Sequence, residues 1–386
     1  MSPQRPRRRP GRRPRPKQPK GASRVGERFE AVVGPVAHGG HCVVRLDPPD
    51  ARVVFVRHAT PGERVILEIT EGTDGDRFWR GDALEVLEPS PDRVTPPCPY
   101  AGPGLCGGCD FQHVALPAQR ALKTAVVREQ LSRLAGLTWD GEVEAVPGDT
   151  DGLRWRTRQQ YVHTPAGLGM RKHRSREVVL VDDCLIARVD AREPAPGIVV
   201  ETVAPHEFEV AADGFWQVHP GAPRILVDSV LGMLAPQPGE KALDLYAGVG
   251  LFSRFLLDAV GERGRVVAVE GDRTASDLSV RNCPGIKAQA GSVEDVLATE
   301  FDERFDLVVL DPPREGARRP VVEQVVDRAP RAIAYVACDP AALARDLAIF
   351  AEHGYELREL RGFDLFPMTH HVECVALLAK SDSDLR

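Results

Sequence analysis

The order of apolar and polar positions changes near residue 241. Beyond it, short apolar runs alternate with segments in which apolar residues recur every three or four positions. The runs predict strands at 241–246, 265–270, 305–311 and 332–338, and the recurring segments predict helices at 251–259, 273–282, 318–328 and 340–352. Such alternation is typical of a parallel sheet with helices on both faces. Two last strands, 355–366 and 370–379, have no helix between them and should form an antiparallel hairpin.

The N-terminal third is patterned differently. Gly, Pro and Asp turns separate five short apolar runs, which predict strands at 29–33, 42–46, 53–56, 63–69 and 78–86. Five short strands so close together predict a small closed barrel of the oligonucleotide-binding type. Downstream, we expect an amphipathic helix at 116–134 with a basic outer face, and strands at 155–163 and 177–181.

These patterns divide the chain into four parts. We expect a basic tail at 1–25, an OB-like barrel at 26–90, a small central domain at 91–200, and an α/β Rossmann-like domain at 201–386. The Pro- and Ala-rich stretch 191–197 marks the last boundary.

Charge is concentrated at the N-terminus. The net charge is −6, yet the first 24 residues carry ten Lys and Arg side chains and no acidic one. Such a tail buries too little apolar surface to fold, so we expect it to be disordered and to attract phosphate backbones, although a purely solubilising tail fits as well. We find no apolar run of membrane-helix length and no signal-peptide core, so we expect a cytoplasmic monomer with no membrane contact.

A glycine-rich loop follows the strand at 241–246. It reads Asp244-Leu-Tyr246-Ala-Gly248-Val-Gly250, and Tyr246, Gly248 and Gly250 are candidate cofactor contacts because glycines let a ligand approach the backbone. Glu270 ends the next strand, where a carboxylate can accept hydrogen bonds from ribose hydroxyls. The loop lacks the GxGxxG spacing of dinucleotide sites, which favours S-adenosylmethionine as the nucleoside ligand.

A second loop, Asp311-Pro-Pro-Arg-Glu-Gly316, lies at the carboxyl end of the strand 305–311. Ligands of open α/β sheets bind at these strand ends, and two prolines stiffen the loop that carries Asp311. The alternative is an ordinary strand-exit turn. The loop contains no cysteine, so a candidate nucleophile must come from elsewhere.

Cys338 and Glu373 are candidates for covalent chemistry on uracil. Carbon 5 of uracil is a weak nucleophile, so a catalyst must first add a thiolate to carbon 6; carbon 5 can then attack a methyl sulfonium. A base must afterwards remove the proton of carbon 5. Cys338, in Ala-Cys-Asp-Pro, and Glu373, in His-His-Val-Glu, fit the two roles. Alternatively, Cys338 is a buried packing residue and Glu373 a solvated carboxylate.

Four other cysteines form a candidate metal site: Cys98, Cys106, Cys109 and Cys184. Four thiolates can hold an iron–sulfur cluster or a structural zinc ion, and their spacing does not choose between the two. Cys42, Cys283 and Cys374 match no motif, and we interpret them as packing residues.

Together these motifs resemble the RNA uracil-5 methyltransferases. The sequences Asp-Leu-Tyr-Ala-Gly-Val-Gly, Asp-Pro-Pro-Arg-x-Gly, Ala-Cys-Asp-Pro with Arg345-Asp346, and Phe366-Pro-x-Thr-x-His-Val-Glu occur in the order seen in that family, and Phe215-Trp-Gln217 matches its glutamine motif. The resemblance implies a class I methyltransferase fold, with Cys338 as nucleophile and Glu373 as base. Further residues are expected to line the methyl-donor and uracil pocket: Gln217, Tyr246, Glu270, Asp311 and, against the adenine, Ser292.

The resemblance extends upstream. The strands with Gly39-Gly40 and Pro61-Gly62-Glu63 are similar to the TRAM domain, an RNA-binding barrel. Cys106-Gly-Gly-Cys109-x-x-Gln-His resembles the cluster motif of the ribosomal-RNA branch, which favours a [4Fe-4S] cluster over zinc and rRNA over tRNA.

Two departures from the family are visible. Only 33 residues separate Cys184 from Gln217, so part of the central domain is expected to be missing, and Met368 stands where the family often has histidine. Two other functions stay open: a methyltransferase for exocyclic amines that uses the Asp311 loop, and a non-catalytic RNA-binding cluster protein.

Overall fold

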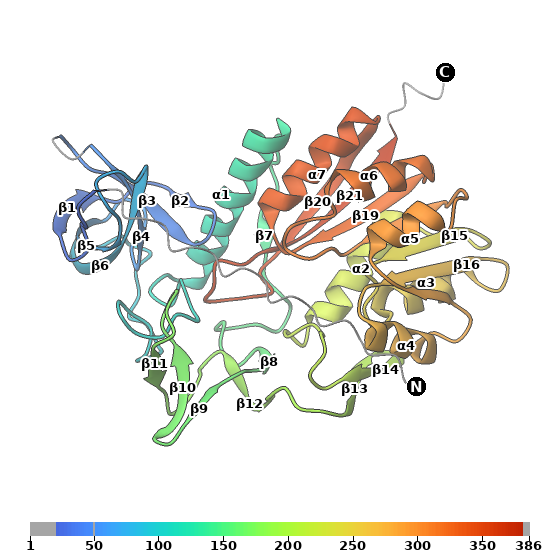
Figure 1. Ribbon diagram of the computed structural model, residues 1–386, viewed down its shortest axis with the longest axis horizontal. Helices are drawn as coiled ribbons and strands as arrows, with labels where there is room; N and C mark the ends of the chain where they lie inside the picture. Colours follow the sequence, from blue (N-terminus) through green and yellow to red (C-terminus); the bar gives the residue numbers. More distant parts are fainter. Residues whose placement is uncertain (1–20, 49–50, 381–386) are drawn as a thin grey trace, which may run out of the picture.

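The chain folds into a small N-terminal sheet, a central segment of one long helix and short strands, and a large helix-covered sheet (Figure 1). The computed structural model describes residues 21–48 and 51–380. Most of the predicted basic tail, residues 1–20, lies outside the described residues.

The N-terminal sheet has six strands in the order β1-β5-β6-β4-β3-β2. Their inward side chains form a separate core in which Val54, Val65 and Leu67 are fully buried. The five predicted strands all occur, with ends displaced by at most two residues, whereas the two-residue β2 was not predicted. The bounds are β1 Arg28–Val32, β2 Val36–Ala37, β3 His41–Arg45, β4 Val53–Arg57, β5 Arg64–Glu71 and β6 Phe78–Glu88.

The prediction of a disordered tail was wrong for residues 21–25. Ser23 forms a β-bridge with Thr73, and Arg24 Nε donates a hydrogen bond to Asp74 Oδ1 at 2.5 Å. These contacts fasten the segment to the edge of the N-terminal sheet.

The central segment begins with α1, which ends at a left-handed Gly136, and continues through short strands. The predicted strand 155–163 is divided into β8 and β9, which belong to different sheets. Sequence analysis assigned no strand to the parts of the chain that form β7, β10, β12, β13 and β14. The last two residues of β12 fall in the predicted boundary at 191–197. The bounds are α1 Leu116–Ala135, β7 Val143–Glu144, β8 Arg156–Arg158, β9 Val162–Thr164, β10 Gly167–Arg171, β11 Val178–Leu180, β12 Ala187–Arg192, β13 Ile198–Val203 and β14 His206–Ala211.

The large sheet has the order β17-β16-β15-β18-β19-β21-β20-β7. Strands β15 to β19 are mutually parallel where they pair, and β21 lies antiparallel between β19 and β20. All predicted strands and helices of this region occur; α2, α5 and β17 were not predicted. The bounds are α2 Ala222–Leu234, β15 Lys241–Leu245, α3 Leu251–Val260, β16 Arg265–Glu270, α4 Arg273–Asn282, β17 Lys287–Ala290, α5 Val293–Thr299, β18 Leu307–Leu310, α6 Arg318–Asp327, β19 Ala332–Ala337, α7 Pro340–Glu352, β20 Tyr355–Phe363 and β21 Glu373–Lys380.

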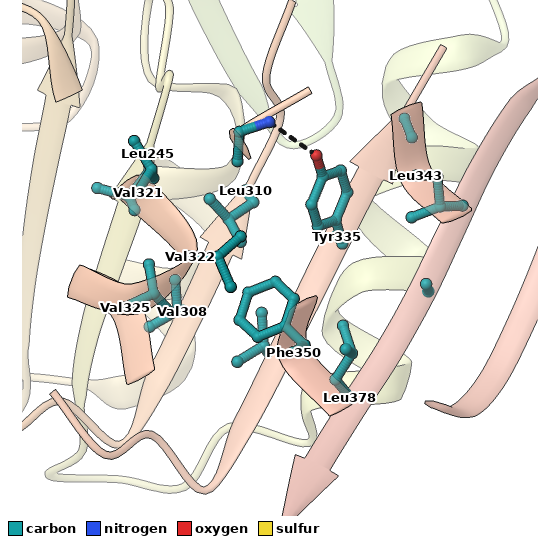
Figure 2. Packing of buried hydrophobic residues seen from close by; sticks show 14 of the residues in the cluster. Leu245, Val308, Leu310, Val321, Val322, Val325, Tyr335, Leu343, Phe350 and Leu378 are labelled. Atoms are coloured by element: carbon teal, nitrogen blue, oxygen red, sulfur yellow. Dashed lines mark hydrogen bonds between the residues drawn. The ribbon is translucent and has the colours of Figure 1, made fainter. Parts of the chain in front are cut away.

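Two apolar cores cover the two faces of this sheet. Successive strand residues point to opposite faces, so Val308 packs in the core beneath α1, α5, α6 and α7, and Val309 in the core beneath α2, α3 and α4. Figure 2 shows the first core, in which Val322 and Phe350 pack against the sheet. Because both faces are covered, the central strands are apolar throughout.

A buried ion pair joins the central segment to the large sheet. Lys123 Nζ of α1 lies 2.5 Å from Asp364 Oδ1 and also donates to the Phe366 carbonyl at 3.0 Å. Both charged side chains are nearly inaccessible, at 1% and 3% exposure. They hold the start of the chain segment that leads from β20 to Glu373.

No helix in the described parts of the chain is long and apolar enough to cross a membrane.

Replacing Lys123 with Ala should destabilise the protein strongly, because Asp364 is left buried without its countercharge. Loss of one partner of a buried pair costs about 3–5 kcal/mol. The matched control is Arg133→Ala, which removes the exposed Arg133–Glu129 pair and should cost less than about 1 kcal/mol. Urea-unfolding midpoints measure both effects, and equal midpoints for the two variants would contradict the prediction.

Candidate functional site

A cavity of about 1390 Å³ opens at the carboxyl ends of the parallel strands. Its wall includes residues of the glycine loop and of the Asp311 loop, together with Cys338 and Glu373. The four candidate metal ligands also line it. All predicted site residues except Gly250 line this cavity: Gln217, Tyr246, Gly248, Glu270, Ser292, Asp311, Cys338, Glu373, Cys98, Cys106, Cys109 and Cys184.

The strand register brings Cys338 and Glu373 together. Ala337, the last residue of β19, pairs with Cys374 of β21, and this is the final pair of their ladder. Cys338 is the next residue after β19 and Glu373 is the first residue of β21, so both lie at the end of this ladder, where the Glu373 carboxylate acts on the pKa of the Cys338 thiol. Glu373 is buried at 4% exposure, and Cys338 is partly exposed.

Burial and nearby charges raise the pKa values of both groups. Burial, followed by repulsion from Glu373 and Asp311, raises the pKa of the Cys338 thiol to about 12, and Arg314 opposes the shift. Burial, followed by Asp311, also raises the pKa of Glu373 well above its usual value. Arg314, to which sequence analysis gave no role, is therefore the cation that acts on both members of the pair.

The glycine loop is built around the Glu270 carboxylate. Gly248 N–H donates to Glu270 Oε2 at 2.8 Å, and Asp272 N–H donates to Oε1 at 2.7 Å. Tyr246, at φ 63°, has a left-handed backbone that non-glycine residues seldom adopt. A side chain at Gly248 would meet no atom within 4 Å, so this glycine opens the loop toward the cavity.

Gly250 does not line the cavity, and its contact with the cofactor stays a prediction. A Cβ atom at Gly250 would lie 2.7 Å from Cys283 Sγ, and its φ of 94° favours glycine. The Cys283 thiol also donates to the Gly250 carbonyl at 3.3 Å. Gly250 therefore lets α3 and α4 approach closely, and Cys283 packs against it. Cys42, Cys283 and Cys374 are all buried, as expected of packing residues.

Gln217 and Ser292 reach the cavity from loops that follow β14 and β17. Gln217 is buried at 9% exposure, next to Phe215, whose exposure is 69%. Ser292 caps α5, accepting a hydrogen bond from Asp295 N–H at 3.4 Å. Its position at the helix start fixes the side chain beside the cavity.

A buried carboxylate holds the far end of the Asp311 loop. Ala317 N–H donates to Asp346 Oδ2 at 2.7 Å and to Tyr335 Oη at 3.1 Å, and the Tyr335 hydroxyl donates to Asp346 at 2.5 Å. Arg314 Nη2 of the same loop lies 3.3 Å from His371 Nε2. The Arg345-Asp346 motif thus has a structural explanation that sequence analysis did not find, because Asp346 supports the loop from α7.

Carboxylates are unusually concentrated around the cavity. Burial raises the pKa of Asp244 to about 7, and burial with repulsion from Asp244 and Glu270 raises the pKa of Asp311 to about 7. Hydrogen bonds from the side chain and the backbone of Ser253 favour the charged form of Asp244, and Ser253 Oγ donates at 2.5 Å. A wall with this excess of acidic groups is suited to a positively charged ligand.

The four cysteines line the same cavity. Gly108 N–H points at Cys106 Sγ at 3.4 Å, and Gln112 Nε2 at Cys109 Sγ at 3.4 Å. Burial raises the pKa of Cys106, and repulsion from Cys184 and Cys98 adds to it, so these thiols are neighbours. Within residues 21–48 and 51–380, however, no three His, Cys, Asp or Glu side chains are arranged to hold a metal ion. The iron–sulfur prediction gains no support from this arrangement.

Comparison with known proteins gives the family. Residues 292–381 match the family model described as tRNA (Uracil-5-)-methyltransferase, and residues 224–335 match the methyltransferase small domain. A 23S rRNA (uracil(1939)-C(5))-methyltransferase of Chromohalobacter salexigens is 30% identical, over 89% of this chain and 88% of its own length. The chain belongs to the RNA uracil-5 methyltransferase family.

Other members of the family show how the chain differs in length. An uncharacterized RNA methyltransferase of Streptomyces avermitilis is 44% identical over 92% of this chain and 98% of its own. That alignment spans 428 positions, more than the 386 residues of this chain, so the relative contains segments that are missing here. The Pyrococcus abyssi tRNA (uracil-54, C5)-methyltransferase, solved with S-adenosyl-L-homocysteine, shares the fold with a TM-score of 0.68 and 20% identity, covering 91% of this chain and all of that one. The class I methyltransferase fold is thereby established for this uracil-5 methyltransferase.

Replacing Asp311 with Asn should remove a pH-dependent loss of stability. The folded-state pKa of Asp311 is raised above its unfolded value, so the folded state holds this proton more tightly and loses stability as pH rises from about 4 to about 7. The ligand-free wild type should therefore lose more melting temperature between about pH 4.5 and about pH 8 than Asp311→Asn does. Calorimetry measures both. Asp277→Asn, an exposed change within α4, should behave as wild type; a wild-type slope in Asp311→Asn would contradict the assignment.

Proposed function

We propose that this protein methylates carbon 5 of a uridine in RNA, with Cys338 as nucleophile, Glu373 as base and S-adenosylmethionine as methyl donor. The observation that carries the proposal is the β19–β21 register, which places Cys338 and Glu373 at the end of one ladder and at the cavity beside the glycine loop. Family membership supports the same reaction.

S-adenosylmethionine would supply an electrophilic methyl group. The Cys338 sulfur adds to carbon 6 of the uracil, and the displaced electron pair makes carbon 5 nucleophilic enough to take the methyl group. Glu373 then removes the proton from carbon 5, the double bond re-forms, and the bond between sulfur and carbon 6 breaks. The uridine has to leave its stack to reach Cys338.

The electrostatics of the cavity suit this order of events. Cys338 reacts only as a thiolate, and its raised pKa keeps it a thiol until a cation offsets the acidic wall. A bound sulfonium would provide that charge, with Arg314 adding to it. The raised pKa of Glu373 makes its carboxylate a stronger base once it has lost its own proton.

The methyl donor would lie along the glycine loop. Glu270 would accept hydrogen bonds from its ribose, Ser292 would contact its adenine, and Gly248 leaves room for its backbone contact. Gln217, Tyr246 and Asp311 would line the space between the donor and the uracil. All of these residues border one cavity.

We infer that the RNA is ribosomal rather than transfer RNA. The cysteine motif resembles the rRNA branch, and the Chromohalobacter relative carries a 23S rRNA name. The six-stranded N-terminal sheet would be a TRAM-type barrel that binds this RNA, together with the basic residues before it. The division at residues 25, 90 and 200, the cytoplasmic location and the monomeric state stay predictions.

An exocyclic-amine methyltransferase and a non-catalytic RNA-binding protein both leave the pairing of Cys338 with Glu373 unexplained. An amine is already nucleophilic and needs no thiolate, and a binding protein needs neither group. Covalent trapping separates the proposed function from both alternatives, and a methylation assay separates the two alternatives from each other.

Wild-type protein with S-adenosylmethionine should form a covalent adduct with RNA containing 5-fluorouridine, because fluorine cannot leave as a proton. Cys338→Ala should abolish both adduct and methylation. Glu373→Gln should still add the methyl group to unmodified RNA but remain attached to it. Gel shift under denaturing conditions and mass spectrometry detect the adducts, and Cys374→Ala is the control for loss of a neighbouring thiol. An adduct that survives Cys338→Ala would exclude this mechanism.

The same assay decides the RNA class. Transcripts of 23S rRNA fragments should be methylated and trapped, whereas tRNA transcripts should not. Trapping on tRNA alone would reverse the rRNA inference and leave the chemistry intact.

We propose further that Cys98, Cys106, Cys109 and Cys184 bind a [4Fe-4S] cluster. The support for a cluster over zinc is the resemblance of Cys106-Gly-Gly-Cys109-x-x-Gln-His to the cluster motif of the ribosomal-RNA branch. A cluster binds each thiolate at a different iron. N–H groups that point at two of the sulfurs would stabilise thiolates.

Protein purified without air should be brown and contain about four irons and four sulfides, since four thiolates bind one cluster. Cys106→Ser should lower the iron content and leave Cys338 intact, whereas Cys42→Ser should retain it. Stoichiometric zinc in colourless protein would overturn the assignment. Methyl transfer needs no electron, so we expect the cluster to be structural.

A further inference from the structure

The turn between β2 and β3 of the N-terminal sheet contacts the residues that flank the reacting pair. Ala37 pairs with His41, which leaves His38-Gly39-Gly40 as the turn. The backbone of both glycines is left-handed, with φ of 95° and 77°. In this tight turn the His38 side chain faces Asp339, and Gly40, which has no side chain, faces His370 and Asp110.

His38 binds the residue next to the nucleophile. His38 Nε2 lies 3.0 Å from Asp339 Oδ2, and Asp339 directly follows Cys338. The other carboxylate oxygen of Asp339 accepts the Ala342 N–H at 2.8 Å and caps α7. With one oxygen on the helix and one on the turn, the Asp339 side chain is fixed at both ends, and so is the backbone that carries the thiol.

Gly40 contacts the loop on the base side of the pair. A Cβ atom at Gly40 would lie 2.6 Å from His370 Cβ and 3.3 Å from Asp110 Cβ, so only glycine fits. His370 Nδ1 lies 2.6 Å from Asp110 Oδ2, and the His370 N–H donates to the same oxygen at 3.2 Å. Asp110 is also paired with Arg57 of β4 at 3.5 Å. His370 precedes Glu373 by three residues.

We propose that this turn is a positioning element of the active site and that His38 is a positioning residue for Cys338. The inference rests on the proposed function. It gives the N-terminal sheet a part in the chemical step in addition to RNA binding. The turn contacts Asp339, which follows Cys338, and His370, which precedes Glu373. It therefore sets the position of the thiol relative to the carboxylate.

The prediction is a defect in turnover without a defect in binding. His38→Ala frees one oxygen of Asp339 and should lower kcat by roughly 10- to 100-fold, the range expected when a reacting group is displaced by a fraction of an ångström to 1 Å. KM for RNA and for S-adenosylmethionine should stay near the wild-type values. Adduct formation with 5-fluorouridine RNA, which reports Cys338 addition directly, should slow by the same factor.

Two further variants make the test specific. His38→Gln keeps an N–H donor that can reach Asp339 and should restore most of kcat, whereas His38→Leu keeps the bulk without the donor and should not. His353→Ala changes an exposed histidine at the opposite end of α7 and should behave as wild type. If His38→Ala does not fold, the contrast between Gln and Leu carries the test.

Unchanged kcat in His38→Leu would overturn the proposal. A rise in KM for RNA with unchanged kcat would also overturn it and assign the turn to RNA binding alone. Failure of the underlying function looks different: wild-type protein would then form neither 5-methyluridine nor an adduct. If wild type forms both and every His38 variant equals it, only the positioning role is wrong.

Discussion

The antiparallel pairing of β21 with β19 is the constraint on which the site depends. A shift of one residue would turn Glu373 to the opposite face of the sheet and away from Cys338. The shift is prevented by packing, because Cys374, Val375 and Ala376 are fully buried and alternate between the two cores. The position of Glu373 relative to Cys338 is therefore fixed by apolar contacts on both faces of the sheet, without a direct bond between the two side chains.

The carboxylates in and behind the cavity wall lower the stability of the fold, because burying a charged group costs free energy that other contacts must offset. Asp244, behind the wall, and Glu373 are buried and Asp311 is partly buried; all three have raised pKa values, and an apolar residue would be easier to bury at each position. Together with the left-handed backbone of Tyr246, they show a site organised around charge that a ligand brings. The same carboxylates that raise the Cys338 pKa in the empty site would stabilise a cation there, so thiol activation and cofactor binding are linked.

Most of the fold could be predicted from local pattern, and the failures have physical causes. The central strands, such as β18, are apolar runs buried on both faces, and α7 begins at an Asp-Pro cap, so both were readable. Strand β7 has two residues and exists only because β20 pairs with it. The motif placed Gly250 at the cofactor, but its tight contact with Cys283 arises from helix packing that no local pattern encodes. Helix α2 was missed although apolar residues recur with helical spacing, from Leu226 to Leu234.

The site residues themselves were readable because their motifs carry chemistry, whereas the residues that support them were not. Lys123 and His38 act across hundreds of positions, and Asp346 acts on a loop 29 positions before it; a lone sequence does not give such partners. The upstream segment completes the large sheet: Val143 pairs with Gly362, and Arg361 is bound to Glu144 at 2.7 Å. Lys123 and Asp110 hold the two ends of the loop before Glu373.

Upstream parts of the chain hold the segments next to Cys338 and Glu373, so substrate binding to those upstream parts can affect the positions of both residues. The loop from Asp364 to His371 is held by residues of the central segment, and the backbone after Cys338 is held by the N-terminal sheet. Any ligand that binds those upstream parts more tightly in one arrangement than in another must bias the arrangement of the reacting pair by the same free energy. RNA bound across the N-terminal sheet and the central segment would thus act on the separation between thiol and carboxylate through these three contacts, without touching either group.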